Sequence, residues 1–207
     1  MWTRCADNEE SLEILAEYEK YGIREVWLTP HIMEDIPNTT EALKERFAEL
    51  QQAYKGNLTL HLAAEYMLDS LFNERFEQND LLAIGTGGNG LLVETSYYNL
   101  PMDFYDTLEK IRKKGFHPVL AHPERYRYMD KKDYLKLKSM GVKFQMNLFS
   151  LVGAYGEKAL YKCRMLLAEE MYDLAGTDTH NLMMFSRFVA EKKLSKEECK
   201  RLITLKK

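Results

Sequence analysis

The stretch "FYDTLEKIRKKGFHPVLAH" at residues 104–122 contains the unit from which the fold is built. Its first part is charged and amphipathic, and Gly115 stands where a helix commonly ends in a left-handed residue. The run after this glycine is apolar, which is typical of a parallel strand covered on both faces, and it ends in His122. We therefore predict a helix followed by a strand, with a histidine at the carboxyl end of that strand.

The same unit recurs along the chain, at residues 11–31, 42–65 and 133–147, with Gly22, Gly56 and Gly141 between helix and strand. Two further apolar runs, "GLLVET" at 90–95 and "YDLAGTD" at 172–178, predict additional strands. The alternation of helices and strands predicts an α/β protein with at least six strands in a parallel sheet, open or closed into a barrel. Because no linker of low complexity interrupts it, we predict one domain over residues 1–207.

Composition excludes several classes of protein. The 207 residues carry a formal net charge of -3, which argues against a general nucleic-acid binder, since phosphate-backbone affinity needs a basic surface. No apolar run approaches the roughly 20 residues that span a bilayer, and the polar start "MWTRCADNEE" is not a secretory signal. Three cysteines without a CxxC pattern predict reduced thiols and a cytoplasmic protein.

One glycine-rich segment resembles a phosphate-binding loop without matching one. The run "GTGGNG" at 85–90 precedes a strand, whereas a Walker or dinucleotide loop links a strand to a helix. We interpret it as a turn.

Ionisable side chains gather at the carboxyl ends of the predicted strands, which share one face in β/α architectures. The residues at these ends are His31, Glu65, Glu94, His122, Asn147, Asp178 and His180. Imidazoles together with carboxylates suit manganese, iron or zinc, and the absence of thiolates disfavours a structural zinc site. Clustered divalent ions promote hydrolysis of phosphoesters, so the pattern predicts a metal-dependent hydrolase.

Other polar residues leave alternatives open. His61 in mid-strand and His117 at a strand start are predicted to be structural. Arg125 either forms a surface ion pair with Glu124 or binds a substrate phosphate through its guanidinium. Tyr97 and Tyr98, just after Glu94, either line a pocket for an aromatic substrate or pack at its rim.

Five segments together carry a family resemblance: "TPH", "AAEY", "LLVET", "VLAHPERY" and "GTDTHN". In this order and spacing they resemble the polymerase and histidinol phosphatase (PHP) superfamily, and most closely the bacterial manganese-dependent tyrosine-protein phosphatases of capsular and extracellular polysaccharide synthesis. The resemblance implies a distorted barrel of seven βα units, up to three metal ions, and dephosphorylation of tyrosines on a partner kinase. The metal-ligand positions that it implies are His31, Glu65, Glu94, His122, Asp178 and His180. Glu94 matches the bridging carboxylate and Arg125 the phosphate-binding arginine.

The sequence departs from this family in two places. The family begins with a strand that bears His-x-His, whereas here the first helix is predicted to begin by about Glu9 and "MWTRCADN" contains no histidine. Either the sequence is truncated or altered at its start, or the gene has lost part of the site. We therefore predict a barrel that lacks its first strand, with exposed sheet edges through which copies could associate as a homo-oligomer. Where the family often has a further arginine, this chain has Phe185, with Arg187 two residues later.

The leading hypothesis is a manganese-dependent phosphatase that acts on phosphotyrosine in a kinase of polysaccharide synthesis. A first alternative is a small-molecule phosphatase that acts on a metabolite such as histidinol phosphate. A second is an impaired remnant that binds a partner, motivated by the missing strand. Shallow, tyrosine-lined surroundings would favour a protein substrate, and a closed basic pocket would favour a metabolite.

Overall fold

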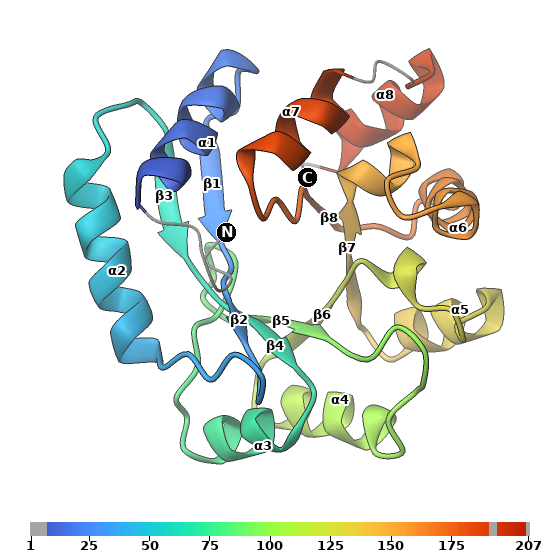
Figure 1. Cartoon of the computed structure of the whole chain (residues 1–207). Helices are drawn as coiled ribbons and strands as arrows, with labels where there is room; N and C mark the ends of the chain where they lie inside the picture. Colours follow the sequence, from blue (N-terminus) through green and yellow to red (C-terminus); the bar gives the residue numbers. More distant parts are fainter. Residues whose placement is uncertain (1–7, 191–193, 206–207) are drawn as a thin grey trace. The chain divides into compact units, whose positions relative to one another are not determined.

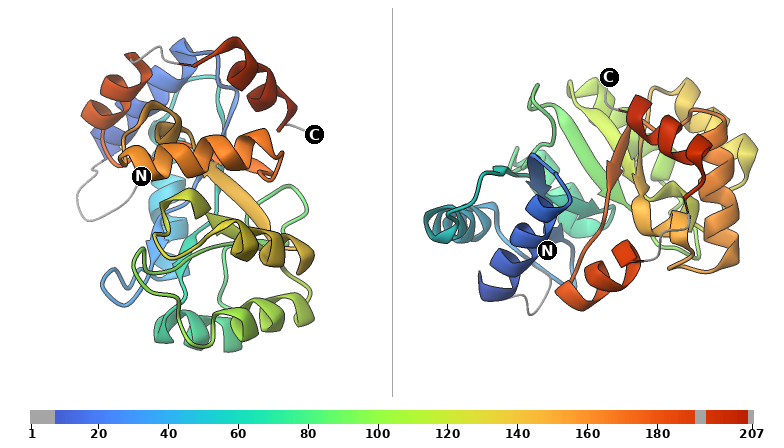
Figure 2. Two further views of the ribbon diagram at one scale, coloured as in Figure 1. Left: turned by 90° about the vertical axis from the view of Figure 1, so that its right-hand side faces the viewer. Right: turned by 90° about the horizontal axis from the view of Figure 1, so that it is seen from above.

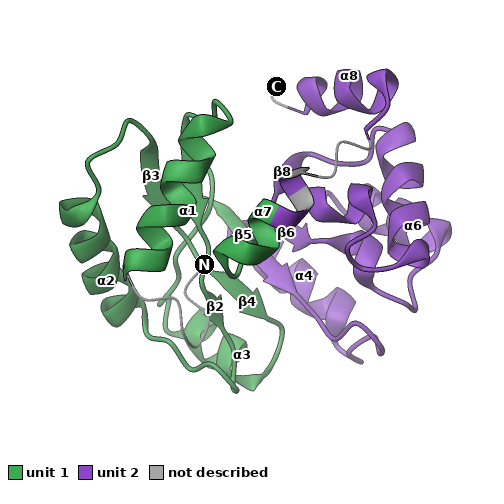
Figure 3. Ribbon diagram, turned by 45° about the horizontal axis from the view of Figure 1, so that its top comes forward, with its two compact units in different colours: residues 1–91, 179–186 green, residues 92–178, 187–207 purple. Residues whose placement is uncertain are grey.

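The structure is a computed structural model that describes residues 8–190 and 194–205. Its contacts divide the chain into two compact units, which are coloured separately in Figure 3. Unit 1 contains residues 1–91 and 179–186, and unit 2 contains residues 92–178 and 187–207. The predicted absence of a first strand concerns the start of the chain, where residues 1–7 lie outside the described residues. A single domain over the whole chain stays a prediction.

Unit 1 begins with helix and strand in alternation, as predicted (Figure 1). Its elements are α1 (Asn8–Lys20), β1 (Glu25–Leu28), β2 (His31–Ile32), α2 (Thr40–Ala53), β3 (Thr59–Leu62), β4 (Glu65–Met67) and α3 (Ser70–Glu77). The chain passes from one unit to the other within β5 (Gly90–Glu94), between Asp178 and Thr179, and within α7 (Leu182–Ala190). The segment 85–90 is a turn, as predicted, closed by backbone hydrogen bonds between Ile84 and Gly90.

The first two predicted strands are each divided into two shorter ones. β1 pairs with β3 and β2 pairs with β4, both in parallel, and Pro30 separates β1 from β2. Proline has no N–H to donate to a ladder, although its carbonyl oxygen still accepts the Glu65 N–H at 3.0 Å. The register after this interruption makes His31 the direct neighbour of Glu65.

The core of unit 1 contains Phe185, which stands where the resembling family often has an arginine. Phe185, on α7, is buried, and its ring centroid lies 4.8 Å from that of Tyr18 on α1 in an edge-on arrangement. A second aromatic contact joins Phe185 to Tyr21 at 5.9 Å. Phe185 is therefore a packing residue, because aromatic pairs of this kind stabilise a core.

Unit 2 continues the alternation of helices and strands. Its elements are α4 (Phe104–Lys113), β6 (His117–Ala121), α5 (Lys131–Ser139), β7 (Lys143–Asn147), α6 (Glu157–Ala168), β8 (Leu174–Gly176) and α8 (Lys196–Thr204), with 3₁₀ helices at Pro123–Arg125 and Leu148–Val152. Strands β6, β7 and β8 pair in parallel. α4 packs on β6, and α6, orange in Figure 2, packs on both 3₁₀ helices.

Two of the predicted helix-ending glycines show why that position needs glycine. Gly115 after α4 and Gly141 after α5 have φ angles of +94° and +78°, in the left-handed region. Gly56 differs from the prediction, since its φ is not positive. There a Cβ would meet the phenol end of Tyr54 and the Glu19 carboxylate, so these two side chains would have to shift.

The sheet arrangement confirms the predicted α/β class with parallel strands. The described residues contain eight strands, and the larger sheet has the order β2-β4-β5-β6-β7-β8. The smaller sheet consists of β1 and β3. Among the described helices, none is both long and apolar enough to cross a membrane.

Candidate functional site

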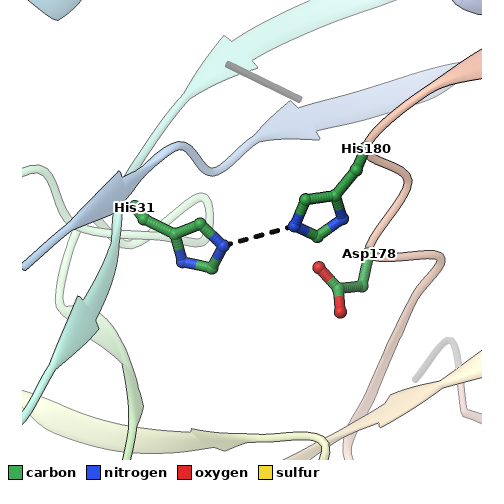
Figure 4. Close-up of side chains that lie close together, drawn as sticks. All are labelled: His31, Asp178 and His180. Carbon is green, nitrogen blue, oxygen red and sulfur yellow. Dashed lines mark hydrogen bonds between the residues drawn. The ribbon is translucent and has the colours of Figure 1, made fainter. Parts of the chain in front are cut away.

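Unit 1 brings together two histidines and a carboxylate that the sequence places at strand ends. The Nε2 atoms of His31 and His180 lie 3.4 Å apart, and Figure 4 shows the two rings directed toward each other. The other ring nitrogen of His31, Nδ1, lies 3.5 Å from Oε2 of Glu65. Strand register explains the second contact, because His31 and Glu65 are partners in the β2–β4 ladder. Asp178, also drawn in Figure 4, precedes His180 by two residues in the chain.

Unit 2 contains a second pair of the same chemistry. Nε2 of His122, which follows β6, lies 3.5 Å from Oε2 of Glu94 at the end of β5. Both side chains are almost fully buried. The hydroxyl of Tyr97 donates a long hydrogen bond of 3.5 Å to the same carboxylate oxygen.

The donor atoms in both units have the chemistry and spacing that a divalent ion requires. Two ligand atoms that bind one tetrahedral ion at about 2.1 Å lie about 3.4 Å apart. The His31–His180 and His122–Glu94 separations match this value, and 3.5 Å is long for an ordinary hydrogen bond. The carboxylate of Glu65 lies beside the other ring nitrogen of His31 and offers a further oxygen donor.

Arg125 is held between aromatic rings in unit 2. Its guanidinium carbon lies 4.4 Å from the ring centroid of Tyr97 and 4.1 Å from that of Tyr155. Its Nη1 donates to Oδ2 of Asp178 at 2.7 Å. The predicted alternative of a surface ion pair with Glu124 is wrong, because Arg125 is largely buried and its ion pair is with Asp178. Arginine held in this way is preorganised, since two aromatic rings pack on the guanidinium and a carboxylate accepts from it.

Asn147 donates hydrogen bonds to two residues that contact Arg125. Its Nδ2 donates to Oδ2 of Asp178 at 3.2 Å and to the hydroxyl of Tyr155 at 3.1 Å. Burial raises the pKa of Tyr155 to about 12, so this hydroxyl keeps its proton at neutral pH. The sequence predicted Asn147 at the end of a strand. Tyr155 lies in a loop after a 3₁₀ helix, and no sequence pattern identified it as a candidate.

Glu124 is a buried carboxylate whose role the sequence missed. Its Oε1 accepts the Asn147 N–H at 3.0 Å and the Ser150 hydroxyl at 2.7 Å. Its Oε2 accepts the Tyr172 hydroxyl at 2.9 Å. Burial raises the pKa of Glu124, while these hydrogen bonds act in the opposite direction. Glu124 therefore fixes the turn that carries His122 and Arg125 to the end of β7.

Two of the candidate residues have an unusual backbone conformation. His122 and Asp178 have φ angles of 34° and 50°, and the described residues contain only four non-glycine residues with positive φ. Such a conformation costs energy in L-residues and is concentrated at functional sites. It turns the chain sharply just where each strand ends.

The remaining candidates lie elsewhere. His61 stacks on Trp27 at 4.5 Å and its Nε2 lies 3.1 Å from Glu25, while His117 is exposed at the start of β6. Both places agree with the structural roles predicted for them.

A cavity of about 540 Å³ in unit 1 has the wrong charge for phosphate. Its lining residues are Glu9, Glu10, Glu13, Leu182, Met183 and Ser186. Three carboxylates would repel an anion, and none of the candidate ligands is among the lining residues. We therefore place no phosphate there.

Parallel strands and paired histidine and carboxylate side chains together describe an α/β protein with a candidate site for divalent ions. Within that class the comparison with known families is specific. Residues 5–204 match the model of the family described as "Capsular polysaccharide synthesis, CpsB/CapC", and the chain belongs to this family.

Individual relatives agree with this assignment. The chain is 28% identical over 187 residues to the tyrosine-protein phosphatase CpsB of Streptococcus pneumoniae, covering 84% of this chain and 76% of that protein. It is 24% identical to the tyrosine-protein phosphatase YwqE of Bacillus subtilis (strain 168), covering 86% of this chain and 72% of that protein.

A solved structure confirms the fold class. The match comes from crystal structures of YwqE from Bacillus subtilis and CpsB from Streptococcus pneumoniae, described as unique metal-dependent tyrosine phosphatases. The TM-score is 0.77 at 19% identity, and the match covers 97% of this chain and 86% of the other. At this identity the likeness establishes the fold.

Proposed function

We propose that this protein is a metal-dependent phosphatase that removes phosphate from tyrosine side chains of a protein. The observation that carries the proposal is the pairing of imidazole with imidazole or carboxylate at metal-like spacing, at His31–His180 and His122–Glu94. Membership of the CpsB/CapC family and the names of the relatives support the phosphotyrosine substrate.

The proposed metal ligands come from both units. They are His31, Glu65 and His180 from unit 1, with Glu94, His122 and Asp178 from unit 2. Manganese is the proposed ion, because the set consists of nitrogen and oxygen donors without thiolates, and iron or zinc would fit the same donors. When bound, such ions supply Lewis-acid activation of water and of the phosphoryl group.

Arg125 is the proposed phosphate-binding residue. A guanidinium offers paired N–H donors that match two phosphoryl oxygens, and Tyr97 and Tyr155 hold its plane in place. Charge on these oxygens is stabilised best by donors that need no rearrangement during the reaction. Tyr97 therefore contacts both Arg125, through its ring, and the proposed metal ligand Glu94, through its hydroxyl.

The experiment that tests the proposal is metal-dependent hydrolysis. Purified protein, stripped with a chelator and reloaded with manganese, is expected to hydrolyse p-nitrophenyl phosphate and a phosphotyrosine peptide. The metal content is measured on the same samples by elemental analysis. Metal binding without any turnover would contradict the enzyme and leave a binding protein. Turnover of histidinol phosphate in preference to both aryl phosphates would favour the small-molecule alternative.

The proposal extends to the cellular setting of the protein. We propose a tyrosine kinase of polysaccharide synthesis as the substrate protein, in keeping with the family description. The free thiols of Cys163 and Cys199 support a cytoplasmic location. Association of copies through sheet edges stays a prediction, which sedimentation of the purified protein would test.

A further inference from the structure

A short segment after β5, residues 97–102, exposes an unusual concentration of large apolar side chains. Tyr98, Leu100 and Met102 expose 62%, 38% and 105% of their reference surface. The other large exposed apolar residues are spread singly along the described chain: Tyr21, Leu135, Tyr161, Leu174, Met183, Leu194 and Ile203. Single exposed apolar residues are ordinary, whereas three within five residues of chain identify this segment as a candidate binding surface.

The segment is held firmly against the turn that carries Arg125. The carbonyl oxygen of Tyr97 accepts the Arg127 N–H at 2.9 Å, and the Arg127 guanidinium lies 4.6 Å from the ring centroid of Tyr98. The ring of Tyr97 packs on Arg125 at 4.4 Å. These three contacts fix the start of the segment beside the proposed phosphate-binding residue and leave its apolar tips in solvent.

This arrangement fits a polypeptide better than a metabolite. Pockets for small molecules are concave and enclose most of their ligand, and side chains as exposed as Tyr98 and Met102 enclose nothing. A peptide that presents a phosphotyrosine to Arg125 must continue past it on either side. The apolar tips then offer contact area to the flanking residues, and Arg127 offers positive charge to an anionic phosphopeptide.

We propose that Tyr98, Leu100 and Met102 form a docking surface for the residues that flank the phosphotyrosine of a protein substrate. The proposal rests on the phosphatase function proposed above. It adds that recognition extends beyond the phosphotyrosine itself, and that apolar residues near it in the substrate increase its rate of hydrolysis.

The test compares two substrates of one enzyme. In the double variant Leu100→Ser/Met102→Ser, kcat/KM for a phosphotyrosine peptide with flanking apolar residues should fall about tenfold, as for loss of interface contacts. The same constant for p-nitrophenyl phosphate should stay within about twofold, since this substrate has no flanking residues. Neither residue belongs to the proposed metal ligands or to the tyrosine pair that holds Arg125.

The control is Tyr161→Ser/Ile203→Ser, which removes two equally exposed apolar side chains from other parts of unit 2. This control should leave kcat/KM unchanged for both substrates. A second pair of variants, Met102→Glu and Met102→Lys, should lower and raise kcat/KM for an acidic phosphopeptide, respectively.

Each outcome bears on one proposal. Equal losses on both substrates, or no loss on the peptide, would overturn the docking surface while leaving the phosphatase intact. No hydrolysis of either substrate by the manganese-loaded wild type would instead overturn the proposed function.

Discussion

The two units build their histidine–carboxylate clusters by different means. In unit 1, His31 and Glu65 are brought together by strand register, two residues side by side in a parallel ladder. In unit 2, His122 and Asp178 follow their strands in left-handed backbone conformations, and a turn fixed by Glu124 supports the first of them. The side chains of the unit 1 cluster are positioned by extended strands. Those of the unit 2 cluster are positioned by strained turns and buried hydrogen bonds.

The partners of the two clusters also differ. The contacts of His31 with Glu65 and His180 join side chains that are all potential metal ligands. In unit 2, Asp178 accepts from Arg125 and Asn147, and Arg125 is packed between two tyrosines. The difference suggests that unit 1 contributes chiefly to metal binding, while unit 2 contributes to both metal and phosphate binding. The following variants test this division.

The largest effect is expected from removing a histidine of unit 1. His31→Ala and His180→Ala should each lower kcat/KM for p-nitrophenyl phosphate by about a thousandfold, because the metal supplies the chemistry of hydrolysis. Elemental analysis should show less manganese per protein. His117→Ala, which alters an exposed histidine, is the matched control and should behave as wild type. Full metal content with full activity in His31→Ala would remove His31 from the proposed metal ligands.

Variants of Glu124 test whether this buried carboxylate has a structural role, in contrast to the carboxylates proposed to bind metal. Glu124→Ala should lower the free energy of unfolding by about 3 kcal/mol, since it leaves the Tyr172 hydroxyl, the Ser150 hydroxyl and a backbone N–H without their acceptor. Glu124→Gln keeps an oxygen acceptor for the Asn147 N–H and the Ser150 hydroxyl, and its NH2 can donate to the Tyr172 hydroxyl oxygen, so it should lose much less. Chemical denaturation measures both. Equal losses in the two variants would show that the charge, and not the hydrogen bonds, matters.

The sequence predicted the alternation of elements and the strand-end residues because both depend on local pattern. Apolar runs, glycines and terminal histidines are visible in a single segment. Glu94 ends β5 and His122 directly follows β6, as predicted. His31 and Glu65 are instead the first residues of the short strands β2 and β4, which begin after the breaks that follow β1 and β3. The division of the first predicted strand at Pro30 was also visible in principle, since proline cannot donate to a ladder.

The roles of Glu124 and Tyr155 were not predictable in this way. Glu124 looks like a surface residue next to an arginine, and only the packing of α6 and the 3₁₀ helices around it buries the carboxylate. Tyr155 reaches Arg125 from a position 30 residues further along the chain. Contacts between distant segments decide both cases, and no local pattern records them.

A smaller effect, on KM but not on metal content, is expected from changing Arg125. This residue is the reason for assigning phosphate binding to unit 2. Arg125→Lys keeps the positive charge but loses the planar pair of donors, so KM for p-nitrophenyl phosphate should rise about thirtyfold. Manganese content should stay at the wild-type value, in contrast to His31→Ala. Loss of metal in Arg125→Lys would mean that the arginine supports the metal-binding residues, and the proposed division between the units would fail.

The smallest expected effect concerns the aromatic support of Arg125. Tyr155→Phe keeps the ring that packs on the guanidinium and removes only the hydroxyl that Asn147 contacts, so KM should change by less than about twofold. Tyr155→Leu removes the cation–π contact and should raise KM about fivefold with little change in kcat. Steady-state kinetics at fixed manganese measures both variants. If Phe and Leu raised KM equally, the hydroxyl and its hydrogen bond to Asn147, and not the ring, would be what holds Arg125 in place.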